Sequence, residues 1–303
     1  MTADHPTQAQ RRRCVCSWFW PLLSRPAQVR RMGWLVLCLG LLSQTSCLKR
    51  EQQPTTSATP TSNAPTKGGQ NSKIPDLGKS DSYNVVDVPN PGTLEVEAVF
   101  VPAPGDPIPK QVEVNVNINA DVCGHKVFTE NLIVDPATKA LKNVVVRLEG
   151  IMAGSRRPPE TVEVTNKNCS FVPHVTVAMK GTKFQVRNDD PVQHTTHPFV
   201  NDIHFFNIVL SAGAEPPRPR TLRQTGLMQT KCDVHAWMNA YTVIHKNPYI
   251  EVSDERGQLT IDQIPPGEYD YLAWHETLPE ARGKVKITGG ETQKLRLEFK
   301  LAQ

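Results

Sequence analysis

Short runs of alternating apolar and polar residues dominate the chain from Thr93 onward. Residues 94–100 (LEVEAVF) and 112–118 (VEVNVNI) alternate with a period of two, as strands with one buried face do. Further β-branched or apolar runs occur at 144–148, 162–164, 175–179, 184–186, 227–230, 241–244, 250–252, 259–261, 269–274, 285–287 and 295–299. Turn formers such as residues 189–191 (DDP) and 265–267 (PPG) separate these runs, and no long stretch shows helical periodicity. The pattern predicts an all-β sandwich architecture.

Residues 1–47 have the layout of an export leader. Arg30 and Arg31 precede an apolar stretch at 33–42 (GWLVLCLGLL), which is too short to span a bilayer as a helix. Cys47 follows it and resembles the lipidated cysteine of bacterial lipoproteins, although Gln44 departs from that motif. We therefore expect an exported, periplasmic or cell-envelope protein with a lipid on Cys47. Simple secretion is the alternative.

The formal charge of +4 belongs to the leader. Residues 1–46 contain six arginines and one acidic residue, whereas the chain from Cys47 onward has 28 basic and 29 acidic residues. A body with no charge bias gives no reason to expect a nucleic-acid partner.

Export also changes how the seven cysteines are counted. Three leave with the leader and Cys47 is the lipid candidate, so Cys123, Cys169 and Cys232 remain in an oxidising compartment. We expect Cys123 and Cys169 to form a disulfide, with two buried free thiols as the alternative. Cys232 then needs another reason to stay unpaired.

That reason is a loop between two predicted strands. Cys232, His235 and Met238 form a C-x2-H-x2-M sequence, which brings together a thiolate, an imidazole and a thioether. This soft ligand set suits copper, whose blue sites use two histidines and a cysteine with a weak axial methionine. The second histidine must come from a distant strand end.

Residues 171–194, which begin F-x-P and continue through Asn188 to His194, resemble the plastocyanin-type cupredoxin motif. The C-x2-H-x2-M loop has the short spacing of amicyanin. The resemblance implies a cupredoxin Greek-key β-sandwich with one mononuclear type 1 copper site. Its ligands would be His194, Cys232, His235 as the exposed imidazole, and Met238 as the axial thioether.

Two positions leave this ligand set open. His197 lies three residues after His194 and is the alternative ligand, although the spacing from Asn188 favours His194. Cupredoxins commonly have asparagine directly after the first ligand histidine, and this chain has Thr195. A threonine hydroxyl can link the ligand loops in a similar way.

The C-terminal part carries a second resemblance. Residues 254–261 (DERGQLTI) and 264–269 (IPPGEY) are similar to the carboxypeptidase regulatory-like, or transthyretin-like, β-fold. That family implies a non-catalytic module, with residues 94–150 as its other half. The combination also resembles cupredoxin-like proteins labelled as methylamine-utilisation proteins.

The expected domains follow from these features. Residues 1–47 are the leader, 48–92 a flexible Pro/Ser/Thr linker, and 93–165 a strand region. Residues 166–247 form the copper domain and 248–303 the regulatory-like β-region.

The leading functional hypothesis is electron transfer to a cytochrome c or another carrier, through the exposed edge of His235. The alternatives are copper delivery, storage or sensing, and a structural cell-envelope protein in which the metal only stabilises the fold. We do not expect an enzyme. Multicopper oxidases need paired H-x-H motifs, which do not occur here, and hydrolytic metal sites keep an open coordination position.

Overall fold

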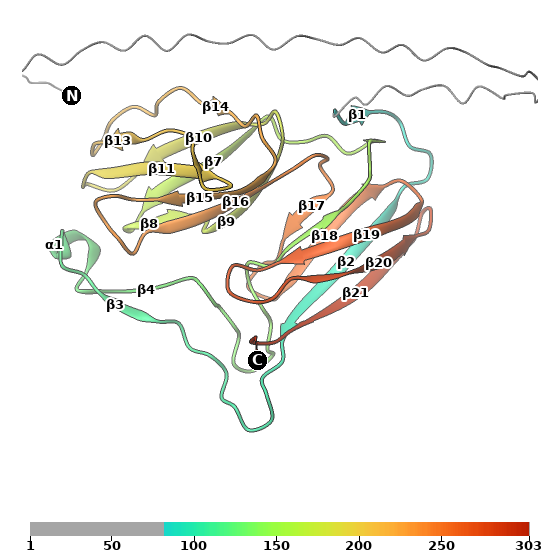
Figure 1. Ribbon diagram of the computed structural model, residues 1–303, viewed down its shortest axis with the longest axis horizontal. Coiled ribbons are helices and arrows are strands. Elements are labelled where there is room, and N and C mark those ends of the chain that lie inside the picture. The colour runs from blue at the N-terminus through green and yellow to red at the C-terminus, as the bar shows by residue number, and fades with distance from the viewer. Residues whose placement is uncertain (1–81, 303) are drawn as a thin grey trace, which may run out of the picture. The chain divides into compact units, whose positions relative to one another are not determined.

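The computed structural model describes residues 82–302, and strands make up nearly all of their regular structure (Figure 1). Within these residues, α1 (Ala120–Cys123) is the one α-helix. The strands form two sandwiches, each built from two sheets around its own apolar core. The predicted all-β sandwich class is therefore confirmed. The predicted leader, including Cys47, lies outside the described residues.

The central sandwich occupies residues 161–245 and consists of a four-stranded and a six-stranded sheet. Its core takes Phe171 and Phe184 from the first sheet and Met228 and Ile244 from the second, each at most 1% exposed. The first sheet has the order β14 (Arg220–Thr221), β10 (Lys183–Asn188), β7 (Thr161–Lys167) and β8 (Ser170–Val172). The second has the order β12 (Ile203–His204), β11 (His194–Val200), β15 (Gly226–Lys231), β16 (Asn239–His245) and β9 (Val175–Met179), with β13 (Ile208–Leu210) also paired to β11.

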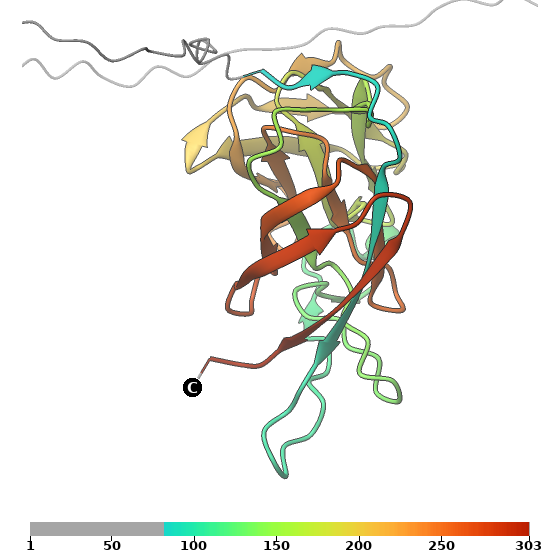
Figure 2. The same cartoon turned by 90° about the vertical axis from the view of Figure 1, so that its right-hand side faces the viewer.

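The flanking sandwich draws its strands from both sides of the central one in the sequence. One sheet has the order β17 (Ile250–Val252), β5 (Val145–Leu148), β19 (Gly267–Trp274) and β20 (Ala281–Ile287), and the other has β18 (Gln258–Ile264), β2 (Gly92–Phe100) and β21 (Thr292–Phe299). The parallel strands β2 and β21 run side by side (Figure 2). The chain thus leaves this sandwich after β5 and returns to it at β17.

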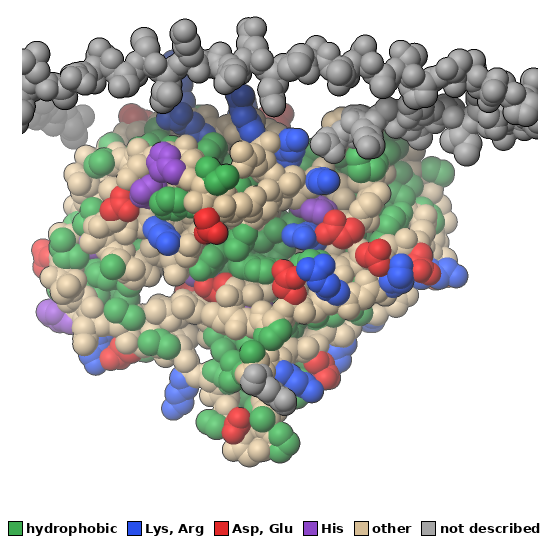
Figure 3. Space-filling view, in the orientation of Figure 1, with side chains coloured by type: hydrophobic (Ala, Val, Ile, Leu, Met, Phe, Trp, Pro, Cys, Tyr) green, Lys and Arg blue, Asp and Glu red, His purple; other side chains and the backbone are tan. Residues whose placement is uncertain are grey.

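The alternation in β2 explains why this strand has one buried face. Leu94, Val96 and Ala98 are at most 2% exposed, whereas Glu95 and Glu97 between them face solvent. Successive side chains of a strand point to opposite faces, so the period of two places the first set in the core. Acidic and basic side chains are interspersed on the face shown in Figure 3. Lys284 and Asp270 form an ion pair at the surface, with Nζ and Oδ1 3.1 Å apart.

A hairpin-like segment between β2 and β5 reaches the central sandwich. This arm, defined as residues 113–128, contains β3 (Glu113–Asn115), α1 and β4 (Lys126–Phe128), and β3 pairs with β4. A disulfide joins Cys123 in the arm to Cys169 after β7, with the two Cα atoms 5.5 Å apart. The predicted pairing of these cysteines is confirmed, and Cys232 is free and buried.

Two smaller features complete the described structure. β1 (Asn84–Val85) pairs with β6 (Ala153–Gly154). A small apolar cluster joins the sandwiches through Val145 and Ile250 on one side and Val175 and Val243 on the other. Within residues 82–302, no helix has the length and apolarity that a membrane crossing requires. The predicted domain limits stay predictions.

Candidate metal centre

Three side chains that the sequence predicts as ligands lie together at one end of the central sandwich. His194 Nδ1 is 2.9 Å from His235 Nδ1, and Cys232 Sγ is 3.9 Å and 3.8 Å from these two nitrogens. The exposed fractions of the three residues are 0% for both histidines and 4% for the cysteine. The group is therefore shielded from water on all sides.

Strand pairing explains how residues 38 positions apart meet. β11 and β15 are antiparallel, with His197 opposite Lys231. Continuing this register by three residues sets His194 at the start of β11 beside the β15–β16 loop, which contains Cys232 and His235. The loop is closed tightly: Cys232 N donates to Met238 O at 3.2 Å, and Met238 N donates to His235 O at 2.9 Å.

Thr195 links the two ligand segments. This is the role expected for it at the position where cupredoxins commonly have asparagine. Its backbone N–H donates to Cys232 Sγ at 3.4 Å, and its Oγ1 accepts a hydrogen bond from Asp233 N at 2.6 Å. Burial alone raises the pKa of the Cys232 thiol, but the contact with the His194 side chain and the hydrogen bond from Thr195 N outweigh burial and lower it to about 7. The site thus favours the thiolate, which is the form that binds metal.

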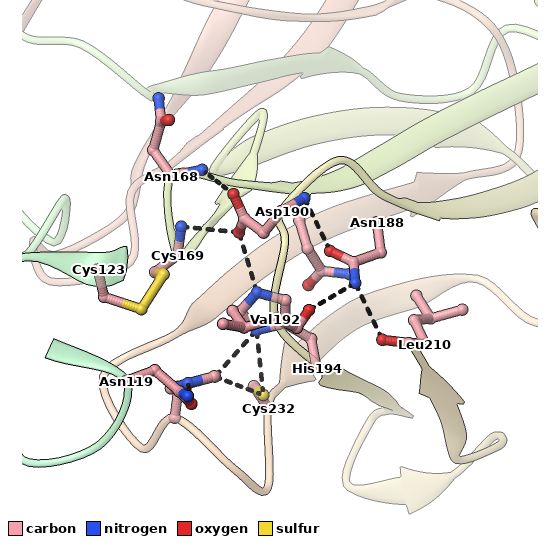
Figure 4. A network of polar contacts seen from close by, with 12 residues as sticks. Asn119, Cys123, Asn168, Cys169, Asn188, Asp190, Val192, His194, Leu210 and Cys232 are labelled. Carbon is pink, nitrogen blue, oxygen red and sulfur yellow. Dashed lines mark hydrogen bonds and ion pairs between the residues drawn. A yellow bond between two sulfur atoms is a disulfide. The ribbon is translucent and has the colours of Figure 1, made fainter. Parts of the chain in front are cut away.

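The ring nitrogen of His194 that does not face Cys232 contacts a carboxylate for which the sequence predicts no role. His194 Nε2 is 2.9 Å from Asp190 Oδ2 (Figure 4). Asp190 is itself buried and accepts hydrogen bonds from the backbone N–H groups of Asn168 and Cys169 at 2.6 and 2.9 Å. This contact holds the Nε2 proton and leaves Nδ1 free for a metal, as carboxylates behind ligand histidines do. The sequence at 189–191 (DDP) is typical of a turn, and a turn pattern gives no reason to expect a contact with His194.

His235 was expected to be an exposed ligand, and the structure contradicts this. Its side chain is fully buried because the arm lies over it, and Asn119 Oδ1 is 3.0 Å from its Nε2. Trp237 packs beside it, with ring centroids 5.0 Å apart, and donates its indole N–H to Cys169 O at 3.0 Å. Burial, and then the neighbouring His194, lower the pKa of His235. No local pattern could reveal this contact, since Asn119 precedes His235 by 116 residues.

Of the other residues considered as ligands, one lies near the three donors and two have partners elsewhere. Met238, the predicted axial ligand, is 2% exposed and belongs to the same apolar core as Cys232. His197, the alternative ligand, lies outside the group, and its Nδ1 contacts Asp233 Oδ1 at 3.0 Å. His174 contacts Glu276 and Asn239 O instead.

The donor set fits a single metal ion. The three donor atoms all lie within 4.8 Å of one another. Metal–nitrogen and metal–sulfur bonds of about 2.0 and 2.3 Å, as zinc forms, let one ion reach all three. Cys169, Asp190 and His194 also lie within this distance, but the Cys169 sulfur is already bonded to Cys123. The structure thus supports one His/Cys/His site.

Parts of this chain are similar to solved protein structures. No protein-family model and no curated protein matches the sequence. The copper-containing nitrite reductase (NirK) from Thermus scotoductus SA-01 is 23% identical over 29% of this chain, with a TM-score of 0.25, and the match spans 23% of that chain. A purple cupredoxin from Nitrosopumilus maritimus is 20% identical over 27% of this chain and 98% of its own, with a TM-score of 0.24. Amicyanin from Paracoccus versutus is 13% identical over 33% of this chain and 97% of its own, with a TM-score of 0.25.

Proposed function

We propose that this protein is an exported copper protein of the cupredoxin kind and that it transfers electrons. The observation that carries the proposal is the buried group of two imidazole Nδ1 atoms and one thiol within 4 Å of one another. Imidazole and thiolate together select copper, zinc and related ions, and the nearby Met238 favours copper because a thioether is a soft ligand. Bound copper supplies a one-electron couple between Cu(I) and Cu(II).

The surrounding residues would hold these ligands in place during a change of charge. Asp190 positions His194, Asn119 positions His235, and Thr195 supports the cysteine sulfur. Asp190 lies in the turn before β11, Thr195 lies in β11, and Asn119 lies in the disulfide-linked arm. Such support limits rearrangement of the ligands, which is what fast electron exchange requires.

We further propose that the protein is not an enzyme, that its partner is a cytochrome c or a similar carrier, and that it sits in the periplasm or cell envelope. Burial of all three donor residues leaves no side of the group open to a substrate. The balanced charge of the body offers nothing for nucleic acid. Attachment to a membrane would occur through a lipid on Cys47.

Copper storage is the second candidate, and the arm over His235 favours it. A ligand enclosed by another segment exchanges its ion slowly, which suits holding copper as much as it suits carrying electrons. The two functions differ in whether the bound ion changes oxidation state reversibly.

A copper titration of the purified protein, followed by visible absorption, tests the proposal. We expect an intense thiolate-to-copper band that bleaches with ascorbate and returns with a mild oxidant. Cys232→Ala should abolish the band, whereas His125→Ala, which removes an exposed imidazole, should leave it unchanged. Absence of the band in the unaltered protein would refute a type 1 copper site. A band that bleaches but never returns would favour storage.

A further inference from the structure

A second pair of histidines lies on the surface of the central sandwich. β11 and β12 form an antiparallel hairpin in which Phe199 is opposite His204. His197 is two residues before Phe199, so His197, Phe199 and His204 share one face of the hairpin. The ring centroids of His197 and His204 are 5.2 Å apart, close to the 4.6 Å between the buried rings of His194 and His235. A separation of this size can be bridged by one ion.

His197 has the orientation that ligand histidines need. Its Nδ1 lies 3.0 and 3.2 Å from the two carboxylate oxygens of Asp233, and Asn207 Nδ2 donates to Asp233 Oδ2 at 2.7 Å. A carboxylate that engages one ring nitrogen orients the other nitrogen toward a metal and increases its basicity.

The nitrogens that a metal would use are free. Among residues 82–302, no hydrogen bond or ion pair engages His197 Nε2 or either ring nitrogen of His204. The His197 side chain is 19% exposed, and His204 is exposed. Lys231 is a cation on this face; it is paired with His197 in the sheet, and its Nζ lies over the Phe199 ring at 5.7 Å. The charge of Asp233 offsets this cation.

We propose that His197 and His204 form a second metal site, distinct from the buried group, that takes a divalent ion of the Cu(II) or Zn(II) class. Imidazole ligands suit such ions, and water completes the coordination at an exposed position. Asp233 acts as the positioning residue behind His197. Asp233 also follows Cys232 directly and donates its N–H to Thr195 Oγ1, so the surface pair and the buried group share a hydrogen-bonded connection.

A calorimetric titration with Zn(II) tests this site independently of the proposed function. The protein is first altered at the buried group by Cys232→Ala and His235→Ala together, which leaves the surface pair intact. We expect this background, which lacks the buried site, to bind one equivalent of zinc at the surface pair. His204→Ala, at an exposed position where folding is not in question, should weaken binding at least tenfold, and Asp233→Asn should weaken it by about 10-fold to 100-fold.

His125→Ala serves as the control, because it removes an exposed imidazole elsewhere on the surface. An equal loss of affinity in this control, or no zinc binding in the altered background, would overturn the proposal. Neither result would bear on the thiolate-to-copper band, so failure of this site and failure of the proposed function are distinguishable. Cu(II) paramagnetic resonance of the same background should show nitrogen hyperfine structure from two imidazoles.

Discussion

Asn119 Oδ1 lies 3.0 Å from His235 Nε2, although the two residues are 116 positions apart in the chain. An amide oxygen only accepts, so His235 donates from Nε2 and its Nδ1 remains unprotonated toward His194 and Cys232. The same contact covers the edge of the His235 imidazole. The resemblance to cupredoxins predicts that electrons leave through this edge. The arm therefore covers the proposed copper site on the side of His235.

Removal of the Asn119 amide should speed electron exchange with small soluble reagents. Asn119 has a left-handed backbone with φ of 54°, so Asn119→Gly preserves the conformation at little cost. We expect a several-fold higher rate of oxidation of the reduced protein by a small inorganic oxidant, measured by stopped flow. Asn115→Gly, also in the arm, is the control and should not change the rate. Equal rates for all three proteins would show that the arm does not limit access.

The buried Asp190 carboxylate should lower the reduction potential of the proposed copper site. Its negative charge and its hydrogen bond to His194 stabilise the oxidised, more positive metal. We expect Asp190→Asn to raise the potential by about 60 mV, which is tenfold in the one-electron equilibrium. Spectroelectrochemical titration measures this. Asp189→Asn is the matched control, since that neighbouring side chain is 45% exposed; an equal rise there would indicate a general charge effect.

Loss of the disulfide should destabilise the protein. Cys123 and Cys169 are separated by 46 positions, and a closed loop of this length corresponds to about 4 kcal/mol of chain entropy in the unfolded state. The Cys123→Ser, Cys169→Ser double variant should therefore unfold at a clearly lower urea concentration. The unaltered protein under reducing conditions should shift in the same direction. An unchanged midpoint would mean that the arm is held by its other contacts alone.

Acid should destabilise the protein through His275. Burial, with a smaller contribution from His174, lowers the pKa of His275 from 6.5 to about 4. The unfolded chain binds this proton near pH 6.5 and the folded chain only near pH 4, so protons favour unfolding in this window. The free energy of unfolding should fall by about 3 kcal/mol as the pH drops from 6.5 to 4, at 1.36 kcal/mol per pKa unit. Urea titrations at several pH values measure the fall, which His275→Asn should largely remove.

The features that the sequence predicted well are local ones. The period of two identifies strands because each strand buries one face, whatever its partners are. Cys232, His235 and Met238 lie within seven residues, so their spacing alone indicates a common loop. A long-range link, the disulfide, was also predicted, by counting the cysteines outside the expected leader, and the structure confirms it.

The features that the sequence could not reveal depend on contacts between distant segments. Asn119 reaches His235 because the arm crosses to the central sandwich, and Asp190 reaches His194 because a turn folds back onto the ligand. Neither contact leaves a periodic trace, since a single hydrogen bond constrains one side chain rather than a run of residues. The local sequence thus specifies the strands and the types of ligand. Tertiary packing determines which ligand is exposed, which ring nitrogen is available to a metal, and which carboxylate contacts the ligand histidine.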